Sequence, residues 1–157
     1  MASLSAFRRA AVSDGEWITV GPDEAKFEIK SRGFTSLYRD TLSNLRHKAA
    51  AKLSRAAIRS GGTLVTPDTL PPSVDDAVQG EALAAHCTLD VRGLEWPAED
   101  DGPPRPVTGQ EFRDMIQQEE YRDLLVLALQ AAIQVTSNRD ADQETAAKNS
   151  STASNGF

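Results

Sequence analysis

Residues Leu124-Leu125-Val126-Leu127-Ala128-Leu129 form an uninterrupted apolar run that decides how this chain folds. The run is the centre of a predicted helix from Tyr121 to about Val135, and it leaves nearly every face of that helix apolar. Such a helix is either central to a core or partly covered by a partner, and we expect it to be core. The apolar run itself is far too short to span a bilayer. Leu124, Leu125 and Leu129 are therefore candidate core or shared-face residues.

The chain changes character after this helix. From Thr136 onward Ser, Thr, Asn, Asp, Gln and Ala dominate, and Phe157 is the only aromatic residue. A segment of this composition does not bury enough apolar surface to offset its conformational entropy. Residues 136–157 are therefore predicted to form a disordered tail.

A short amphipathic helix is predicted ahead of the apolar run. Thr108 and Glu111 have the spacing of a capping box, in which each side chain satisfies a backbone donor of the other residue. Phe112, Met115 and Ile116 then give the helix one apolar face. Residues 97–106 precede it and contain four prolines, so they are predicted to be a loop.

Another helix is predicted between about residues 73 and 88. Ser73 is its predicted N-cap, and Asp75 follows in the first turn, where the helix dipole favours a carboxylate. Gly80 lies inside the helix and lowers its intrinsic stability. Residues 89–94 are expected to turn the chain, with at most one short strand.

A longer helix is predicted from Thr35 or Ser36 to about Ser60, with Gly61-Gly62 at its end. Its apolar residues recur at three-and-four spacing, which is the pattern of a helix that packs one face against a core. Its candidate core or shared-face residues are Phe34, Leu37, Leu42 and Leu45. The remainder is strongly basic, and the candidate basic face comprises Arg39, Arg46, Lys48, Lys52, Arg55 and Arg59.

A β-hairpin is predicted near the N-terminus. Residues 17–20 favour a strand and end at the turn signal Gly21-Pro22. Residues 26–30 alternate charged and apolar side chains, so that Phe27 and Ile29 face inward together. Because a lone hairpin is only marginally stable in water, this one must pack on helices or on a neighbouring molecule.

The 157 residues are enough for one domain with its own core. The expected fold class is mainly α with a small N-terminal β-hairpin (α+β). We expect a flexible arm over residues 1–15, a single helical domain with the hairpin over residues 16–135, and then the tail. No apolar segment follows Arg8 and Arg9, so no signal peptide is expected.

Charge is distributed unevenly along the chain, whose formal net charge is −6. Residues 1–62 carry 11 Lys and Arg against 6 Asp and Glu, whereas residues 63–157 carry 6 against 17. This asymmetry either steers a partner or lets parts of one fold, or of neighbouring subunits, attract each other. The alternative is that the charges are simply solvated helix faces.

No catalytic, metal-binding or cofactor-binding site is predicted, and the chain is expected not to be an enzyme. His86 and Cys87 are adjacent on a predicted helix, so their side chains diverge and do not make a nucleophile–base pair. The single cysteine lacks a disulfide partner and zinc spacing, and its default role is core packing. The acidic clusters lack the pattern of a calcium loop, and no phosphate-binding glycine motif occurs.

The order of these features resembles the tail assembly chaperones of long-tailed bacteriophages. After the hairpin and the basic helix, Glu81-Ala82-Leu83-Ala84-Ala85-His86-Cys87 is similar to the family's "ALAEH" helix. Leu89-Asp90-Val91-Arg92-Gly93-Leu94 is similar to its "LVDWRGL" turn, although Val91 stands where the family often has Trp. Residues 100–108 resemble its "DEDGKPVPYT" stretch, and Phe112 with residues 121–124 resembles its last helices. Residues 147–150 match how such chains often end.

The resemblance implies a non-catalytic protein of the host bacterial cytoplasm that escorts the tape-measure protein until the tail tube polymerises around it. The implied partners are the tape-measure protein, the tail-tube protein and further copies of this chain. A membrane is not implied, and nucleic acid is not the favoured partner. Some members also occur in a longer form made by a programmed ribosomal frameshift, whose extension would follow the predicted tail.

Two other functions stay open on the sequence. One is a phage virion structural or head–tail completion protein of similar size, which would persist in purified virions. The other is a small nucleic-acid-binding regulator that uses the basic helix over residues 34–60 to contact phosphates. Against the second, the chain as a whole is acidic and carries no recognisable nucleic-acid motif.

Overall fold

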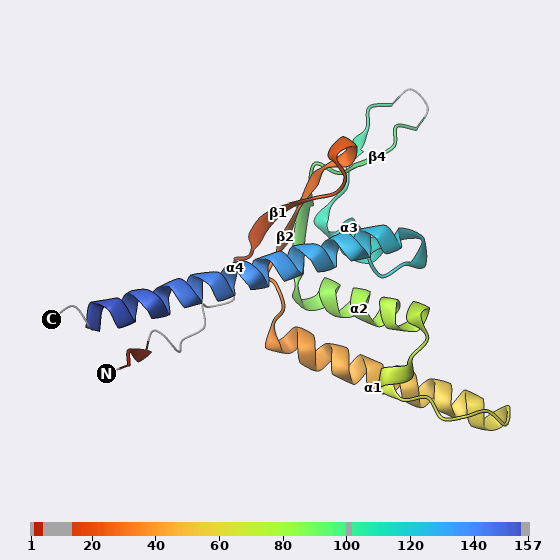
Figure 1. Ribbon diagram of the computed structural model, residues 1–157. Helices are drawn as coiled ribbons and strands as arrows, with labels where there is room; N and C mark the ends of the chain where they lie inside the picture. The colour runs from red at the N-terminus through yellow and green to blue at the C-terminus, as the bar shows by residue number, and fades with distance from the viewer. Residues whose placement is uncertain (1, 5–13, 100–101, 155–157) are drawn as a thin grey trace.

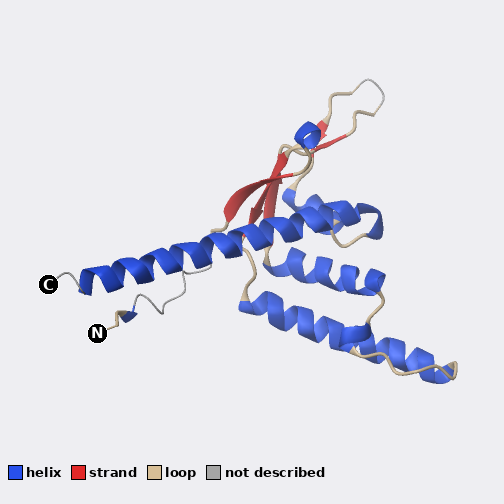
Figure 2. Ribbon diagram, viewed as in Figure 1, coloured by secondary structure: helices blue, strands red, loops and turns tan. Residues whose placement is uncertain are grey.

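The computed structural model describes residues 2–4, 14–99 and 102–154. Within them, long helices and a small antiparallel sheet form one body, so the predicted mainly-α class with an N-terminal β-hairpin is confirmed (Figure 1, Figure 2). Most of the arm predicted over residues 1–15 lies outside the described residues. The main helices are α1 (Ser36–Arg59), α2 (Pro72–His86), α3 (Gly109–Met115) and α4 (Arg122–Ser154).

The predicted hairpin is present and gains a third strand. β1 (Glu16–Val20) pairs with β2 (Phe27–Ser31), and β3 (Thr88–Arg92) pairs with the other edge of β2, all antiparallel. The register aligns Ile18 with Ile29 and Ile29 with Val91, so one face of the sheet is apolar. Separately, β4 (Glu95–Trp96) pairs with β5 (Arg105–Pro106).

The core lies between this apolar face and the helices. α4 packs against β1 and β2, and α3 packs against β3. Phe27 of β2 meets Phe112 of α3 edge to face, with ring centroids 6.2 Å apart. Leu125, in the predicted core run, is only 3% exposed. Burying one leucine of this kind contributes about 1.5–3 kcal/mol, so the apolar run of α4 holds the sheet and helices together.

The predicted end of this helix near Val135 is wrong, because α4 continues through residues 136–154 to Ser154. The first turn of this segment is tied to the body. The Thr136 hydroxyl accepts a hydrogen bond from the Phe34 backbone N–H at 2.9 Å, and Asn138 donates to the Glu16 carboxylate at 3.2 Å. Further along, Ala, Gln and Glu have high helix propensity, which an argument from hydrophobicity alone overlooks.

α1 forms the outermost layer and packs on α2. It begins as predicted, because the Thr35 hydroxyl accepts a hydrogen bond from the Tyr38 backbone N–H at 3.0 Å. Figure 1 shows that the C-terminal end of α1 extends past the N-terminal end of α2. The short 3-10 turn η3 (Pro67–Thr69) lies against α1 in the connection to α2.

α2 begins differently from the prediction. Ser73 is not the N-cap: Pro71 occupies that position, and Pro72 is the first helical residue. Proline suits this place because its fixed φ matches the helix and its missing N–H would be unpaired there anyway. The presence of glycine at position 80 is explained by packing, since a Cβ atom there would lie 2.3 Å from the Ile116 carbonyl oxygen. The glycine therefore allows α2 to approach the end of α3 closely.

Candidate protein-interaction surfaces

The predicted core or shared-face residues divide into two groups. Leu125 is buried, and five others are partly buried against the core: Phe34, Leu42, Leu45, Leu124 and Leu129. Leu37 is the exception, because 64% of it is exposed. The apolar stripe predicted for this helix is therefore wider than the face that α1 buries, and Leu37 lies on the part that stays exposed.

A second exposed apolar residue is Ile133 of α4, which is 56% exposed. The hydrogen bond between Phe34 and Thr136 joins the start of α1 to the middle of α4. Leu37 lies in the first turn of α1, three residues after Phe34 in the chain, and Ile133 precedes Thr136 by one turn of α4. Leu129 shares the face of Ile133, since the two are four residues apart. We call Phe34, Leu37, Leu129 and Ile133 the junction patch.

The predicted basic face is exposed, with one correction. Five of its members are exposed to solvent: Arg39, Lys48, Lys52, Arg55 and Arg59. Arg46 instead pairs with Asp75 of α2, with its Nε atom 2.8 Å from Oδ1. This bond raises the pKa of Arg46 and lowers the pKa of Asp75. Arg46 therefore fastens α1 to α2 and does not belong to the free cationic surface.

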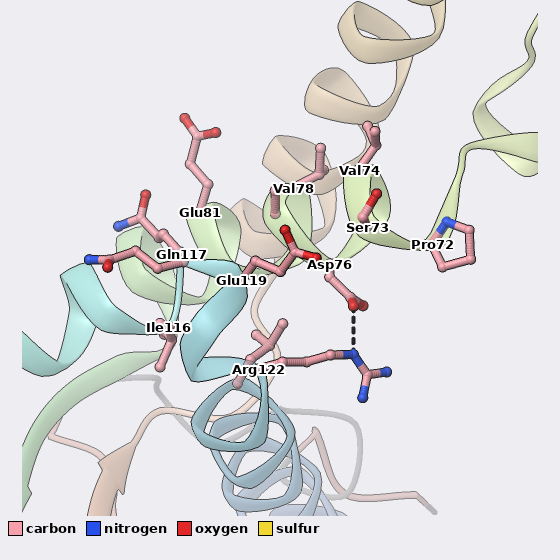
Figure 3. Close-up of a pocket in the computed structure, with 13 residues that line it drawn as sticks. Pro72, Ser73, Val74, Asp76, Val78, Glu81, Ile116, Gln117, Glu119 and Arg122 are labelled. Carbon is pink, nitrogen blue, oxygen red and sulfur yellow. Dashed lines mark hydrogen bonds and ion pairs between the residues drawn. The ribbon is translucent and has the colours of Figure 1, made fainter.

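A cleft that the sequence did not indicate lies between α2 and the segment that joins α3 to α4 (Figure 3). Its volume is about 680 Å³. Val78, Ile116 and Leu125 supply buried apolar wall, while Glu81 and Glu119 are exposed along its edges. We call it the acidic cleft. Its walls come from segments far apart in the chain, so no local pattern in the sequence predicts the cleft. The only related signal is Gly80, which permits the close approach of these segments.

An ion pair crosses the acidic cleft. Arg122, at the start of α4, places its Nε atom 2.7 Å from Oδ2 of Asp76, as the dashed line in Figure 3 shows. The bond to Asp76 raises the pKa of Arg122. Neither Glu81 nor Glu119 has an ion-pair partner within the described residues. Uncompensated negative charge therefore flanks an apolar wall.

His86 and Cys87 do not face each other as a catalytic pair. The His86 Nε2 atom lies 2.8 Å from the Thr41 hydroxyl of α1, so this imidazole links α1 to α2. Cys87 is fully buried, and burial raises the pKa of its thiol to about 12. A thiol in this state is not an activated nucleophile.

No group of three or more His, Cys, Asp or Glu side chains in ranges 2–4, 14–99 and 102–154 is arranged to hold a metal ion. Across the same ranges, none of the helices combines the length and the apolar character needed to cross a membrane. In comparisons with known proteins, neither a family model, nor a curated protein, nor a solved structure matches this chain. Function therefore has to be inferred from the two surfaces, the junction patch and the acidic cleft, together with the basic face of α1.

Proposed function

We propose that this chain is a non-catalytic tail assembly chaperone of a long-tailed phage or prophage, which binds the tape-measure protein in the host cytoplasm and helps the tail tube assemble around it. The observation that carries the proposal is the junction patch. Its two most exposed members, Leu37 and Ile133, lie on helices that are otherwise well anchored to the core. The order of sequence motifs that resembles this family supplies the identity of the client.

The physical requirement for such a chaperone is apolar surface that stays in water without unfolding the protein that carries it. Large apolar side chains that cluster on a surface mark sites of protein interaction. Here Leu37 is three residues from half-buried Phe34, and Ile133 is one turn of α4 from half-buried Leu129, so a client helix that reached both would extend an existing apolar surface. Recognition of an amphipathic helix through apolar anchors is a common mode of protein binding.

Co-expression with the tape-measure protein tests this proposal. We expect the tape-measure protein to become soluble and to elute with this chain from a sizing column. The double variant Leu37→Asp/Ile133→Asp should remain folded, because both positions are exposed, yet lose most of this effect. Leu4→Asp is the matched control, since Leu4 is 88% exposed and lies outside the patch.

Three results would count against the proposal. The tape-measure protein stays insoluble beside the wild-type chain, or the double variant solubilises it as well as the wild type does. The third is recovery of this chain in stoichiometric amounts from purified virions, which favours the virion structural or head–tail completion protein.

The exposed basic face of α1 favours nucleic-acid binding as a second candidate function. Lys48, Lys52 and Arg55 lie on one stripe of the helix, and such a stripe is able to contact phosphates. Binding of this kind weakens steeply as salt rises. Salt-dependent retention of duplex DNA that is lost in Lys48→Glu/Lys52→Glu would support the regulator and weaken the chaperone proposal.

A further inference from the structure

We propose that the acidic cleft of one molecule binds the protruding end of α1 from a second copy of this chain. The inserted face, which we call the basic tip, consists of Lys48, Lys52, Arg55, Ile58 and Arg59. The proposal rests on the structure of the two surfaces and does not depend on the phage assignment. The client surface, the junction patch, is left free in this arrangement.

The basic tip has the features of an unpartnered binding helix. Its residues recur at spacings of three and four, so they share one face of α1. Ile58 is 62% exposed and lies at the edge of this face, one turn after Arg55. The four cations of the tip have no ion-pair partner within the described part of the chain. An exposed apolar side chain next to a stripe of positive charges without ion-pair partners fits a partner that is apolar and acidic.

The acidic cleft offers that chemistry. Its apolar wall, formed by Val78, Ile116 and Leu125, would receive Ile58. Glu81 stands on the α2 side and Glu119 on the other side, so two carboxylates flank the wall (Figure 3). Arg122 is already held by Asp76, which leaves Glu81 and Glu119 to meet the arginines of the tip. A helix that places an apolar face in a groove between charged edges is an established mode of recognition.

The geometry requires two molecules. α2 turns Asp75 and His86 toward its own α1, where they bond Arg46 and Thr41. The same helix contributes Asp76 to the lining of the cleft and Glu81 to its edge. A molecule's own α1 therefore packs on the opposite side of α2 from the cleft. The resulting contact joins two different surfaces head to tail, and such contacts close into rings or continue as open arrays.

The charge distribution of the whole chain agrees with this arrangement. The basic tip belongs to the N-terminal part of the sequence, where Lys and Arg exceed Asp and Glu, and the cleft belongs to the acidic remainder. Opposite potentials on two surfaces accelerate encounter and select the correct orientation. Self-association driven in this way should be strong at low ionic strength and weak at high ionic strength.

Charge reversal with complementation tests the docking. The tip variant is Arg55→Glu/Arg59→Glu, the cleft variant is Glu81→Lys/Glu119→Lys, and a third chain carries both sets. Asp142→Lys/Glu144→Lys on distal α4 is the control matched in charge to the cleft variant. Each protein is examined by circular dichroism and then by sedimentation velocity at about 0.05 M and about 0.5 M salt.

We expect wild type and control to associate at low salt. The tip variant or the cleft variant alone should associate at least about tenfold more weakly, because like charges then face each other. Association should return when the two variants are mixed, and also in the chain that carries both reversals. In addition, Ile58→Ser should weaken association without changing its salt dependence.

Three outcomes overturn the docking. They are a wild-type chain that stays monomeric at low salt, association that neither reversal changes, and reversals that abolish association but fail to restore it on mixing. If the tip reversal alters only DNA retention and leaves the sedimentation coefficient unchanged, the basic tip binds nucleic acid and not a second copy. Failure of tape-measure solubilisation leaves each of these readouts unaffected, so the two proposals fail separately.

Discussion

Gly80 is the residue at which helix propensity and packing oppose each other. Alanine is favoured over glycine by about 1 kcal/mol within a helix, yet its Cβ atom would meet the Ile116 backbone oxygen at 2.3 Å. We expect Gly80→Ala to lower the free energy of unfolding by about 1–3 kcal/mol, as overpacking does. Urea denaturation measures this. Gly62→Ala, whose nearest neighbour would be an ordinary 3.4 Å away, is the control, and a stabilised Gly80→Ala protein would refute the packing argument.

The thiol of Cys87 is predicted to be inert in the folded protein. Burial raises its pKa to about 12, so the neutral thiol predominates at neutral pH and the reactive thiolate is scarce. Labelling with a thiol reagent at neutral pH should therefore be slow and should accelerate in urea along with unfolding. Immediate stoichiometric labelling of the native protein would show that Cys87 is accessible and would reopen a catalytic role for it.

At the scale of elements, α4 combines two functions on different faces. Leu125 faces the core, whereas Ile133 belongs to the exposed junction patch. An aspartate at Leu125 would bury an unpaired charge, so we expect Leu125→Asp to lose more than about 3 kcal/mol of stability or to prevent folding. Ile133→Asp should keep the thermal midpoint close to that of the wild type. Equal destabilisation by the two changes would mean that the junction patch is structural.

The N-terminus of α3 carries a testable pH dependence. Arg105 and the Thr108 backbone N–H bond the Glu111 carboxylate and lower its pKa from 4.5 to about 2. A lowered folded-state pKa stabilises the protein above the unfolded value and loses that effect as pH falls toward the folded value. The urea midpoint of the wild type should thus exceed that of Glu111→Gln above about pH 4.5, and the gap should close toward pH 2. A gap that persists unchanged at pH 2 would contradict the assignment.

Local patterns in the sequence predicted the elements whose stabilising contacts are local. The hairpin, the Thr35 cap and the Thr108–Glu111 capping box each depend on residues a few positions apart, and all three are confirmed. The pairing of β3 with β2 and the bond between Arg46 and Asp75 join distant segments, so no local spacing revealed them. The acidic cleft was missed for the same reason.

The predicted length of α4 was wrong for a different physical reason. Composition predicted disorder from Thr136 onward because few apolar residues follow. It did not account for the hydrogen bond that ties Thr136 to Phe34, nor for the helix propensity of the residues that continue the helix. Leu37, a candidate core or shared-face residue, is exposed in the structure, and Arg46 of the candidate basic face is held by Asp75.

At the scale of the whole molecule, the proposed chaperone uses separate surfaces for client binding and for self-association. In this proposal the junction patch binds the client through its exposed apolar side chains, and the basic tip and the acidic cleft bind neighbouring copies through opposite charges. The two contacts respond differently to salt, since added salt screens ion pairs but does not weaken apolar burial. Client binding should thus survive about 0.5 M salt while self-association declines, and loss of both together in a pull-down series would contradict the division.

Suppression of client aggregation tests the central claim most directly. Tape-measure protein is diluted from urea into buffer with or without this chain, and light scattering follows its aggregation. We predict that a stoichiometric amount of the wild-type chain keeps scattering low, that Leu4→Asp does the same, and that Leu37→Asp/Ile133→Asp does not. Scattering that rises equally with and without the wild-type chain would contradict the account.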